Sequence, residues 1–213
     1  MQTIRIEKKT AEYEAVKALW DLAKLRRKAD KNRSNVSESM HYIHYNVSTK
    51  CLEATDGRAA LVYHHEIAGL DHEVFFELCD NVLVEAGTGL YFPAVPRVIP
   101  ELGHVNMKGE TCENFLYVPN MGFDGNFPAD YLLCSALGHF RVVIDGKYAA
   151  LVKDLLNRFD YIASFRKDGE IAKTAPVYFH SAELEYVVMP LNKYFVDAEI
   201  TSVNREEALK KTA

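Results

Sequence analysis

Two amphipathic helix patterns, each preceded by a strand-like run, constrain this fold more than any other feature of the sequence. In the first, apolar residues from Tyr13 to Ala23 recur at helical spacing after Thr10, whose hydroxyl can cap the first turn. The second helix pattern covers Lys147–Phe159. On the apolar stripes of the two helices, we expect Tyr13, Trp20, Leu151 and Leu155 to be buried against the sheet. Strand-like runs at Thr3–Glu7 and Arg141–Ile144 precede the two helices. The order predicts an α+β fold, in which a duplicated strand-helix-strands unit packs two helices on one face of an antiparallel sheet.

Several short β-type runs follow each predicted helix. After the first helix they are Tyr42–Val47, Cys51–Ala54, Ala59–Ile67 and Glu73–Leu78. After the second they are Tyr161–Arg166, Ala175–His180 and Leu184–Met189. Tight turns are indicated between neighbouring runs by Asp56-Gly57 and by Lys167-Asp168-Gly169.

The middle of the chain, residues 80–140, interrupts this regularity with many glycines and prolines, and we interpret it as an irregular insertion. Within it we expect short strands at Val82–Glu85 and Phe115–Val118, and a helical turn near Asp130–Leu137. The chain is therefore predicted to be one domain over residues 1–204, followed by a charged C-terminal tail at 205–213. Two shortened domains are the alternative.

The charge of the chain restricts any contact with nucleic acid to a local patch. Its 25 basic and 30 acidic residues give a formal charge of −5, which excludes a generally basic binder. The best candidate patch lies at the end of the first helix and consists of Lys24, Arg26, Arg27, Lys28, Lys31 and Arg33. The second helix adds Lys147, Lys153 and Arg158. The alternative interpretation is a solvated helix terminus whose cations complement the helix dipole.

No motif for catalysis, metal binding or cofactor binding stands out, so we expect a protein that is not an enzyme and holds no metal and no cofactor. The histidines, such as His41 and His44, lack acidic or cysteine partners at a recognised ligand spacing. Scattered cysteines and the lack of a long apolar run favour reduced thiols and a cytoplasmic location. The competing hypothesis is an active site in the insertion, where the polar residues are His104, Glu110, Glu113 and Asp124.

Three segments resemble the bacterial sliding clamp, the beta subunit of DNA polymerase III. Leu52–Leu61 is similar to the family's strand-turn-strand segment around a Thr-Asp-Gly turn, without the histidine found there. Glu185–Leu191 is similar to the family's C-terminal Val-Met-Pro segment, and Tyr91–Pro100 to the segment that joins clamp domains. The strand and helix at 141–156 also fit the family in order and spacing.

The resemblance implies a DNA clamp, a processivity factor that contacts double-stranded DNA through basic residues on its helices. It also implies a groove for peptides of a DNA polymerase or other clamp-binding proteins. The positions that match the groove are Thr55, Gly57, Arg58, Val187, Val188, Met189, Pro190 and Leu191. In the family the two groove segments belong to neighbouring domains, so the resemblance implies that the turn of one copy meets the Val-Met-Pro segment of its neighbour. A ring would then need about six copies, and a monomer or a twofold dimer is the alternative. The alternatives are a protein-protein adaptor of a phage or mobile element that does not encircle DNA, and a plain hairpin turn and core strand at the two groove segments.

Overall fold

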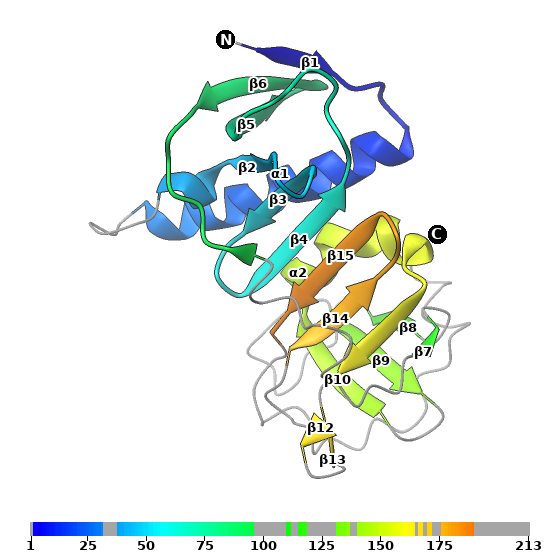
Figure 1. The fold of residues 1–213 in the computed structure, drawn as a ribbon. Coiled ribbons are helices and arrows are strands. Elements are labelled where there is room, and N and C mark those ends of the chain that lie inside the picture. The colour runs from blue at the N-terminus through cyan, green and yellow to red at the C-terminus, as the bar shows by residue number, and fades with distance from the viewer. Residues whose placement is uncertain are drawn as a thin grey trace. The chain divides into compact units, whose positions relative to one another are not determined.

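The computed structural model divides the chain into two compact units (Figure 1). The first unit is Met1–Pro100 with His180–Val187, and the second is Glu101–Phe179 with Val188–Ala213. The described residues are 2–31, 38–95, 110–111, 115–118, 131–136, 140–164, 166–167, 170–171 and 176–189. Side chains are described over 2–31, 38–95, 144–160 and 176–189. The single domain expected over 1–204 stays a prediction, and the expected tail at 205–213 lies outside the described residues.

In the first unit, short strands lie side by side in one sheet. Their order is β1 (Thr3–Arg5), β6 (Val82–Gly87), β5 (Val74–Cys79), β2 (Ile43–Asn46), β3 (Cys51–Thr55), β4 (Ala59–His64) and β15 (Leu184–Val188). β2 pairs antiparallel with both β3 and β5, and β3 pairs antiparallel with β4. The strands expected from the sequence in this part of the chain are confirmed, with ends that differ by a few residues.

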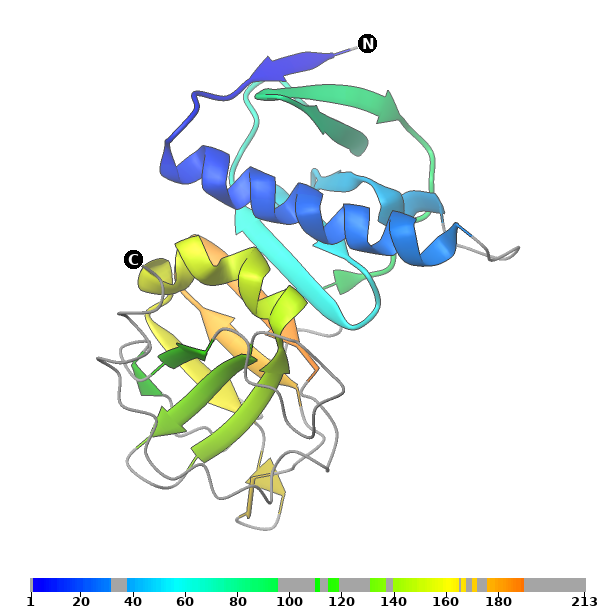
Figure 2. The same cartoon turned by 180° about the vertical axis from the view of Figure 1, so that it is seen from behind.

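The helix α1 (Ala11–Asp30) crosses this sheet and contacts β3, β4 and β5 (Figure 2). The Thr10 hydroxyl accepts a hydrogen bond from the backbone N–H of Tyr13 at 3.1 Å, which confirms the predicted cap. The apolar side chains that α1 buries are Ala15, Val16, Ala18, Leu19, Leu22 and Ala23. Tyr13 and Trp20, which we expected to be buried, are half-buried because they lie at the margin of this apolar stripe.

A second apolar cluster in the first unit includes residues from the segment that follows β6. Its buried members are Cys51, Ala60, Val62, Phe75, Phe92 and Val95. Tyr42 and Leu90 are partly buried and pack against it. The segment at 90–95 therefore packs onto the first unit, although we had assigned it to the irregular insertion. Residues 96–100, the rest of the segment that resembles a domain junction, lie outside the described residues.

In the second unit, the three-stranded sheet has the order β10 (Phe140–Asp145), β9 (Tyr131–Ala136) and β8 (Phe115–Val118). A second group of strands has the order β14 (Val177–His180), β11 (Tyr161–Ser164) and β7 (Glu110–Thr111). The strands β12 (Arg166–Lys167) and β13 (Glu170–Ile171) pair antiparallel, where the sequence indicated a hairpin. The strand predicted at Phe115–Val118 is confirmed. The turn residues 168–169 lie outside the described residues.

Two expectations for the second unit are wrong. The helical turn expected near residues 130–137 is the strand β9, which pairs antiparallel with both β8 and β10. The second helix is also shorter than expected, because α2 (Gly146–Val152) is followed by a 3₁₀-helix, η5 (Lys153–Arg158). Leu155 is buried at 1% exposure, as predicted, whereas Leu151 is half-buried.

The observed arrangement is the predicted α+β class. A strand, a helix and further strands follow one another in both units, as β1, α1 and β2 in the first and as β10, α2 and β11 in the second. Within the described residues, no helix is both long and apolar enough to span a membrane.

Candidate nucleic-acid interface

Four lysines form one exposed row along α1, which we call the lysine face: Lys17, Lys24 and Lys28 in the helix and Lys31 at its C-cap. All four are exposed, and their spacings of seven, four and three residues bring them to one side of the helix. Asp21 lies in the same row, with its carboxylate 3.5 Å from Nζ of Lys17 and 2.5 Å from Nζ of Lys24. The lysine face therefore keeps a net positive charge. The predicted basic patch omitted Lys17, which a helical projection from Lys24 would have found.

Arg26, in contrast, lies on the sheet-facing side of α1. Its Nε donates to Oδ2 of Asp30 at 2.5 Å, and its Nη1 donates to the backbone carbonyl of Asp56 at 3.1 Å. The side chain of Asp30 is only 2% exposed and that of Arg26 is 21% exposed. The Asp30 carboxylate also contacts Nε2 of His41 at 3.1 Å. Arg26 thus joins the end of α1 to the turn after β3, and we leave it out of the surface that could meet a ligand.

Arg27 occupies the border between the lysine face and the rest of the first unit. Its guanidinium donates to Oε1 of Glu77 at 2.5 Å, and this hydrogen bond raises the pKa of Arg27 above its usual value. The same guanidinium lies 5.8 Å from the ring centroid of Trp20 and 5.5 Å from that of Tyr42. Arg33, the last member of the predicted patch, lies outside the described residues.

The turn at Asp56-Gly57 forms as predicted, with Gly57 at a φ of +85°. The Asp56 carboxylate accepts hydrogen bonds from the backbone N–H groups of Arg58 and Ala59. The Thr55 hydroxyl donates to the carbonyl of Ala59 at 2.8 Å and accepts from the N–H of Gly57 at 3.1 Å. Thr55 is buried, so only Gly57 and Arg58 of the three predicted groove residues in this turn are exposed.

The other predicted groove residues are divided between the units. Val187 is buried in the first unit, whereas Val188 and Met189 belong to the second. Val188 is fully buried, and Met189 is 45% exposed. Pro190 and Leu191 lie outside the described residues. The peptide groove therefore stays a prediction.

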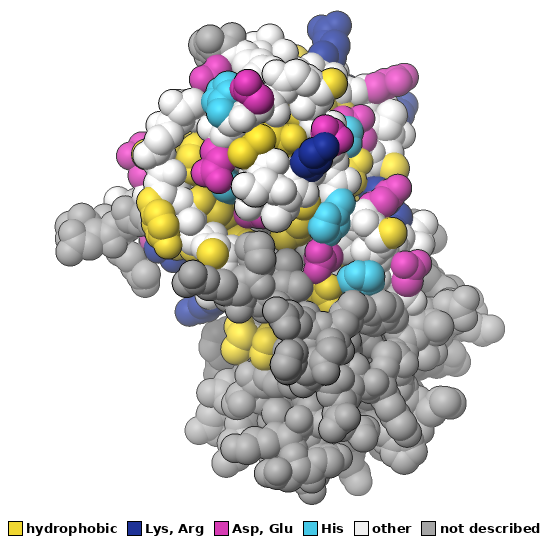
Figure 3. Space-filling view, in the orientation of Figure 1, with side chains coloured by type: hydrophobic (Ala, Val, Ile, Leu, Met, Phe, Trp, Pro, Cys, Tyr) yellow, Lys and Arg dark blue, Asp and Glu magenta, His cyan; other side chains and the backbone are white. Residues whose placement is uncertain are grey.

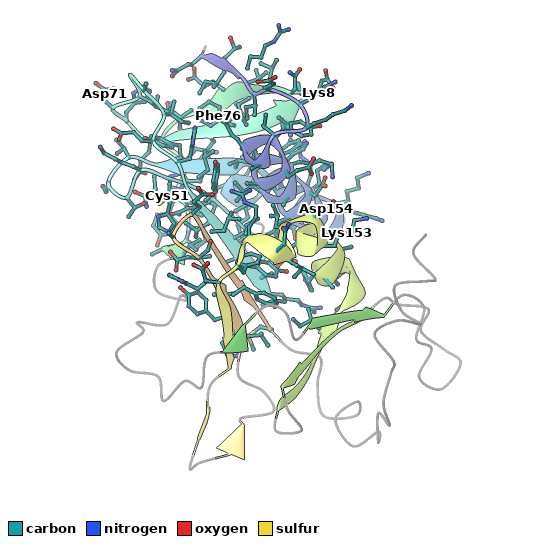
Figure 4. All side chains as sticks on the ribbon, turned by 90° about the vertical axis from the view of Figure 1, so that its right-hand side faces the viewer. Lys8, Cys51, Asp71, Phe76, Lys153 and Asp154 are labelled. Atoms are coloured by element: carbon teal, nitrogen blue, oxygen red, sulfur yellow. The ribbon has the colours of Figure 1, made fainter. Side chains whose placement is uncertain are left out.

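The basic residues of the second unit do not continue along one α-helical face. Lys147 is exposed, and its Nζ lies 3.3 Å from the Asp145 carboxylate and 4.8 Å from the centroid of the Tyr148 ring. Lys153 is exposed at the start of η5 (Figure 4), and Arg158 is half-buried at its end. Their spacings of six and five residues are not whole α-helical turns, and the α-helix ends at Val152, where 3₁₀ geometry follows.

His64 lies between a thiol and a carboxylate that the sequence analysis did not connect. Its Nδ1 is 3.1 Å from Sγ of Cys51, and its Nε2 is 2.6 Å from Oε1 of Glu185. The hydrogen bonds with Cys51 and then with Glu185 raise the pKa of His64 to about 10. The imidazole is therefore protonated at neutral pH. Because the thiol and the carboxylate contact opposite nitrogens of the ring, the three groups do not converge on one point.

Other histidines of the first unit also have a carboxylate neighbour, and histidine and acidic side chains lie together on the face seen in Figure 3. Nε2 of His65 lies 3.3 Å from Glu12, and the buried His44 lies 3.5 Å from Glu53. Glu12 is 53 positions from His65 and Glu53 is 9 positions from His44, and neither is a recognised ligand spacing. Within the described residues, no group of three histidine, cysteine, aspartate or glutamate side chains could hold a metal ion. Cys51 and Cys79 are free thiols.

Most residues of the competing active-site hypothesis lie outside the described part of the chain. His104, Glu113 and Asp124 lie outside the described residues, and of Glu110 only the backbone is described, as part of β7. That hypothesis stays a prediction.

Comparison with known proteins gives matches to solved structures only. No family model and no curated protein matches the chain. A DNA polymerase sliding clamp from Bacillus subtilis is 10% identical, with 90% of this chain and 64% of that chain covered and a TM-score of 0.49. The DNA polymerase III subunit beta from Pseudomonas aeruginosa is 13% identical, with 90% and 67% covered and a TM-score of 0.44.

A third match is the sliding clamp from Bartonella birtlesii, solved with griselimycin bound. It is 11% identical, with 92% of this chain and 67% of that chain covered and a TM-score of 0.46. The chain thus spans about two thirds of the length of the solved clamps it matches. These are structures of the protein family that the sequence motifs resemble.

Proposed function

We propose that this chain is a non-catalytic accessory protein of DNA replication that holds duplex DNA through the lysine face. The lysine face is the single observation that carries the proposal. At the rise of an α-helix, the row from Lys17 to Lys31 is about 21 Å long. Phosphates on one strand of duplex DNA are about 3.4 Å apart along the axis, so several of them come within reach of this row.

Phosphate contacts of this kind hold DNA without reading its sequence, which a protein that moves along DNA requires. Lys28 and Lys31 form no ion pair with any described residue, so their charges are available to a polyanion. Arg27 contributes its charge at the border of the face, although Glu77 already binds it. Lys147, Lys153 and Arg158 make a smaller contribution, because they do not share one helical face.

The test is a titration of labelled duplex DNA at two salt concentrations with the double variant K24A/K28A. Each lost phosphate contact lowers the slope of log affinity against log salt by about 1, so we expect a decrease of about 2 for every DNA sequence. The matched control is K8A, since Lys8 is an exposed lysine of the same unit but lies outside α1. An unchanged slope in the double variant would contradict duplex binding by this face.

The second part of the proposal is a peptide groove between copies of the chain, in which the turn at 55–58 of one copy meets the segment at 187–191 of its neighbour. Its support is the resemblance of both segments to sliding-clamp motifs, together with the exposure of Arg58 and Met189. Griselimycin, which one of the matched clamps holds, is a suitable probe. We expect the chain to bind it and the variant M189A to bind it more weakly, as measured by calorimetry. Equal binding by the two proteins would exclude Met189 from the groove.

An adaptor that does not encircle DNA is the second candidate. The observation in its favour is that Arg26 and Arg27, two of the predicted phosphate ligands, are bound to Asp30 and Glu77. A ring would require several copies of the chain joined head to tail. Solution mass with and without DNA distinguishes the two: a mass of one or two chains that DNA does not change favours the adaptor.

A further inference from the structure

The chain contains a single tryptophan, and it lies at the edge of the lysine face. Trp20 is on the same side of α1 as Lys17 and Lys24, three and four residues away, and it is half-buried. A large aromatic ring in this position is neither part of the buried stripe of α1 nor fully solvated. The side chains around Trp20 therefore indicate which kind of ligand its exposed part could contact.

Basic and aromatic groups alternate around Trp20. The guanidinium of Arg27 lies within 6 Å of the rings of both Trp20 and Tyr42, and Nζ of Lys24 lies 6.0 Å from the Trp20 centroid. Glu77 fixes Arg27 at 2.5 Å, and the Tyr42 hydroxyl donates to Glu38 at 3.4 Å. We call Trp20, Arg27 and Tyr42 the aromatic edge. Two acidic residues thus hold the aromatic edge in place beside the lysines.

Duplex DNA makes no use of such an edge, because its bases are stacked inside and offer no ring face to a protein surface. An unpaired base does offer one, and stacking on tryptophan or tyrosine beside a basic row is how proteins bind single strands without sequence preference. Cations over the rings add to this by favouring the negative phosphates next to the base. The cation-π contacts of Trp20 could also serve only to stabilise α1. The experiment must therefore distinguish base stacking on Trp20 from a structural role of Trp20 in the helix.

We propose that the aromatic edge binds an unpaired base of single-stranded nucleic acid, with the neighbouring phosphates on the lysine face. The inference rests on the proposed function in that both use the lysine face. It adds a preference for strands that are unpaired, such as those next to a duplex end. Asp21 is the one acidic side chain in the row, and it already contacts Lys17 and Lys24.

The test uses the fluorescence of Trp20, which is specific because no other tryptophan is present. Short oligothymidylate, short oligouridylate, a duplex of matched length and inorganic polyphosphate are titrated at one low salt concentration. We expect saturable quenching by the two single strands and little quenching by the duplex or by polyphosphate. Comparison of the two single strands shows whether the sugar matters. Equal quenching by polyphosphate and single strands would overturn the proposal, because charge alone would then explain it.

Affinity measurements on labelled oligonucleotides complete the test. Since one stacked base contributes about 1–3 kcal/mol, W20A should weaken single-strand binding by about 5- to 150-fold and leave duplex binding nearly unchanged. W20F, which keeps a ring, should retain most of the affinity. The matched control is Y91A, since Tyr91 is an 81% exposed aromatic residue of the same unit outside the aromatic edge.

The outcomes separate this inference from the proposed function. If W20A weakens single-strand and duplex binding equally, Trp20 only supports α1, and the inference is wrong while duplex binding stands. If W20F lowers single-strand affinity as much as W20A does, stacking on the aromatic ring is not the cause of binding, and the inference is also wrong. If the unaltered chain binds neither kind of nucleic acid, the proposed function fails together with the inference. Should W20A fail to fold, W20F and the quenching data still decide the question.

Discussion

α1 and the segment that begins with α2 both carry basic residues, but only α1 gathers them on one surface. The 20 residues of α1 keep one helical geometry, so lysines spaced by whole turns stay in register from Lys17 to Lys31. In the second unit Lys147 and Lys153 are six residues apart, which is not a whole number of α-helical turns, and the α-helix itself ends after 7 residues and continues as a 3₁₀-helix. A basic composition therefore becomes a basic surface only where the basic residues recur at whole turns of a continuous helix.

The two neighbouring arginines of α1 sharpen the same comparison. Arg26 and Arg27 are adjacent in the sequence, yet one is enclosed against the sheet and the other is half-exposed beside the lysine face. A rotation of one residue around the helix decides which cation holds the fold together and which one can meet a ligand. The following predictions test these differences, from the largest expected effect to the smallest.

Removal of Arg26 should destabilise the first unit strongly. In R26A the Asp30 carboxylate, which is nearly inaccessible to water, would lose its guanidinium partner, and loss of one member of a buried pair costs about 3–5 kcal/mol. Chemical denaturation monitored by Trp20 fluorescence measures the effect. The control is K28A, which changes an exposed cation on the same helix and should be nearly neutral. If R26A lowered the free energy of unfolding as little as K28A does, the Arg26–Asp30 ion pair would contribute little to stability.

Leu155 gives the corresponding test for the second unit. Its side chain is buried with Val152 and Phe159, so L155A should cost about 2–5 kcal/mol through lost burial and the cavity left behind. The half-buried Leu151 is the matched control, and L151A should cost clearly less. Thermal unfolding followed by circular dichroism checks both variants. If L155A and L151A lowered stability equally, the segment from α2 to η5 would present a different face to the core than the structure shows.

The comparison between the basic segments predicts unequal effects on DNA binding. We expect K147A/K153A to lower duplex affinity and its salt slope less than K24A/K28A does, because only Lys24 and Lys28 belong to a continuous row. Titration of the same labelled duplex with both double variants provides the measurement. A larger loss for K147A/K153A would transfer the main phosphate contacts to the second unit.

The smallest effect concerns pH and His64. The unfolded histidine has an ordinary pKa of about 6.5, and the folded pKa is raised to about 10, so the folded state favours the protonated ring. The stabilisation is therefore complete below about pH 6.5 and is lost as the pH rises through about 10. His64 is partly exposed, so the contribution should not exceed about 1 kcal/mol. Unfolding curves of H64Q and the unaltered chain across this range should converge at high pH; a constant difference would contradict the assignment.

The sequence predicted those features that local patterns determine. The cap at Thr10, the helix that follows it and the turn at Gly57 follow from short-range chemistry, and all three are present. β9 was mistaken for a helical turn because its continuous apolar run, Tyr131 to Cys134, has no periodicity that separates a strand from a helix. The pairing of this run with two neighbouring strands is what decides its conformation.

For the candidate site, the sequence predicted the general location but not the individual roles. Counting basic residues identified the end of α1, yet it treated Arg26 and Lys28 alike and omitted Lys17. A helical projection would have corrected both points. The bond from Arg26 to Asp56 and the contact between His64 and Glu185 join residues 30 and 121 positions apart, and no local pattern encodes them.

The position of β15 has a consequence for the order in which the chain folds. The backbone N–H of His64 donates to the carbonyl of Glu183 at 2.8 Å, so the sheet of the first unit includes a strand from the far end of the described chain. During synthesis, β15 emerges about 120 residues after β4, which takes on the order of 6–24 s at 5–20 residues per second. The edge of β4 that pairs with β15 stays unpaired during this time. An uncovered strand edge can pair with other chains during that interval. Slowed translation between β4 and β15 should therefore increase aggregation of the nascent protein.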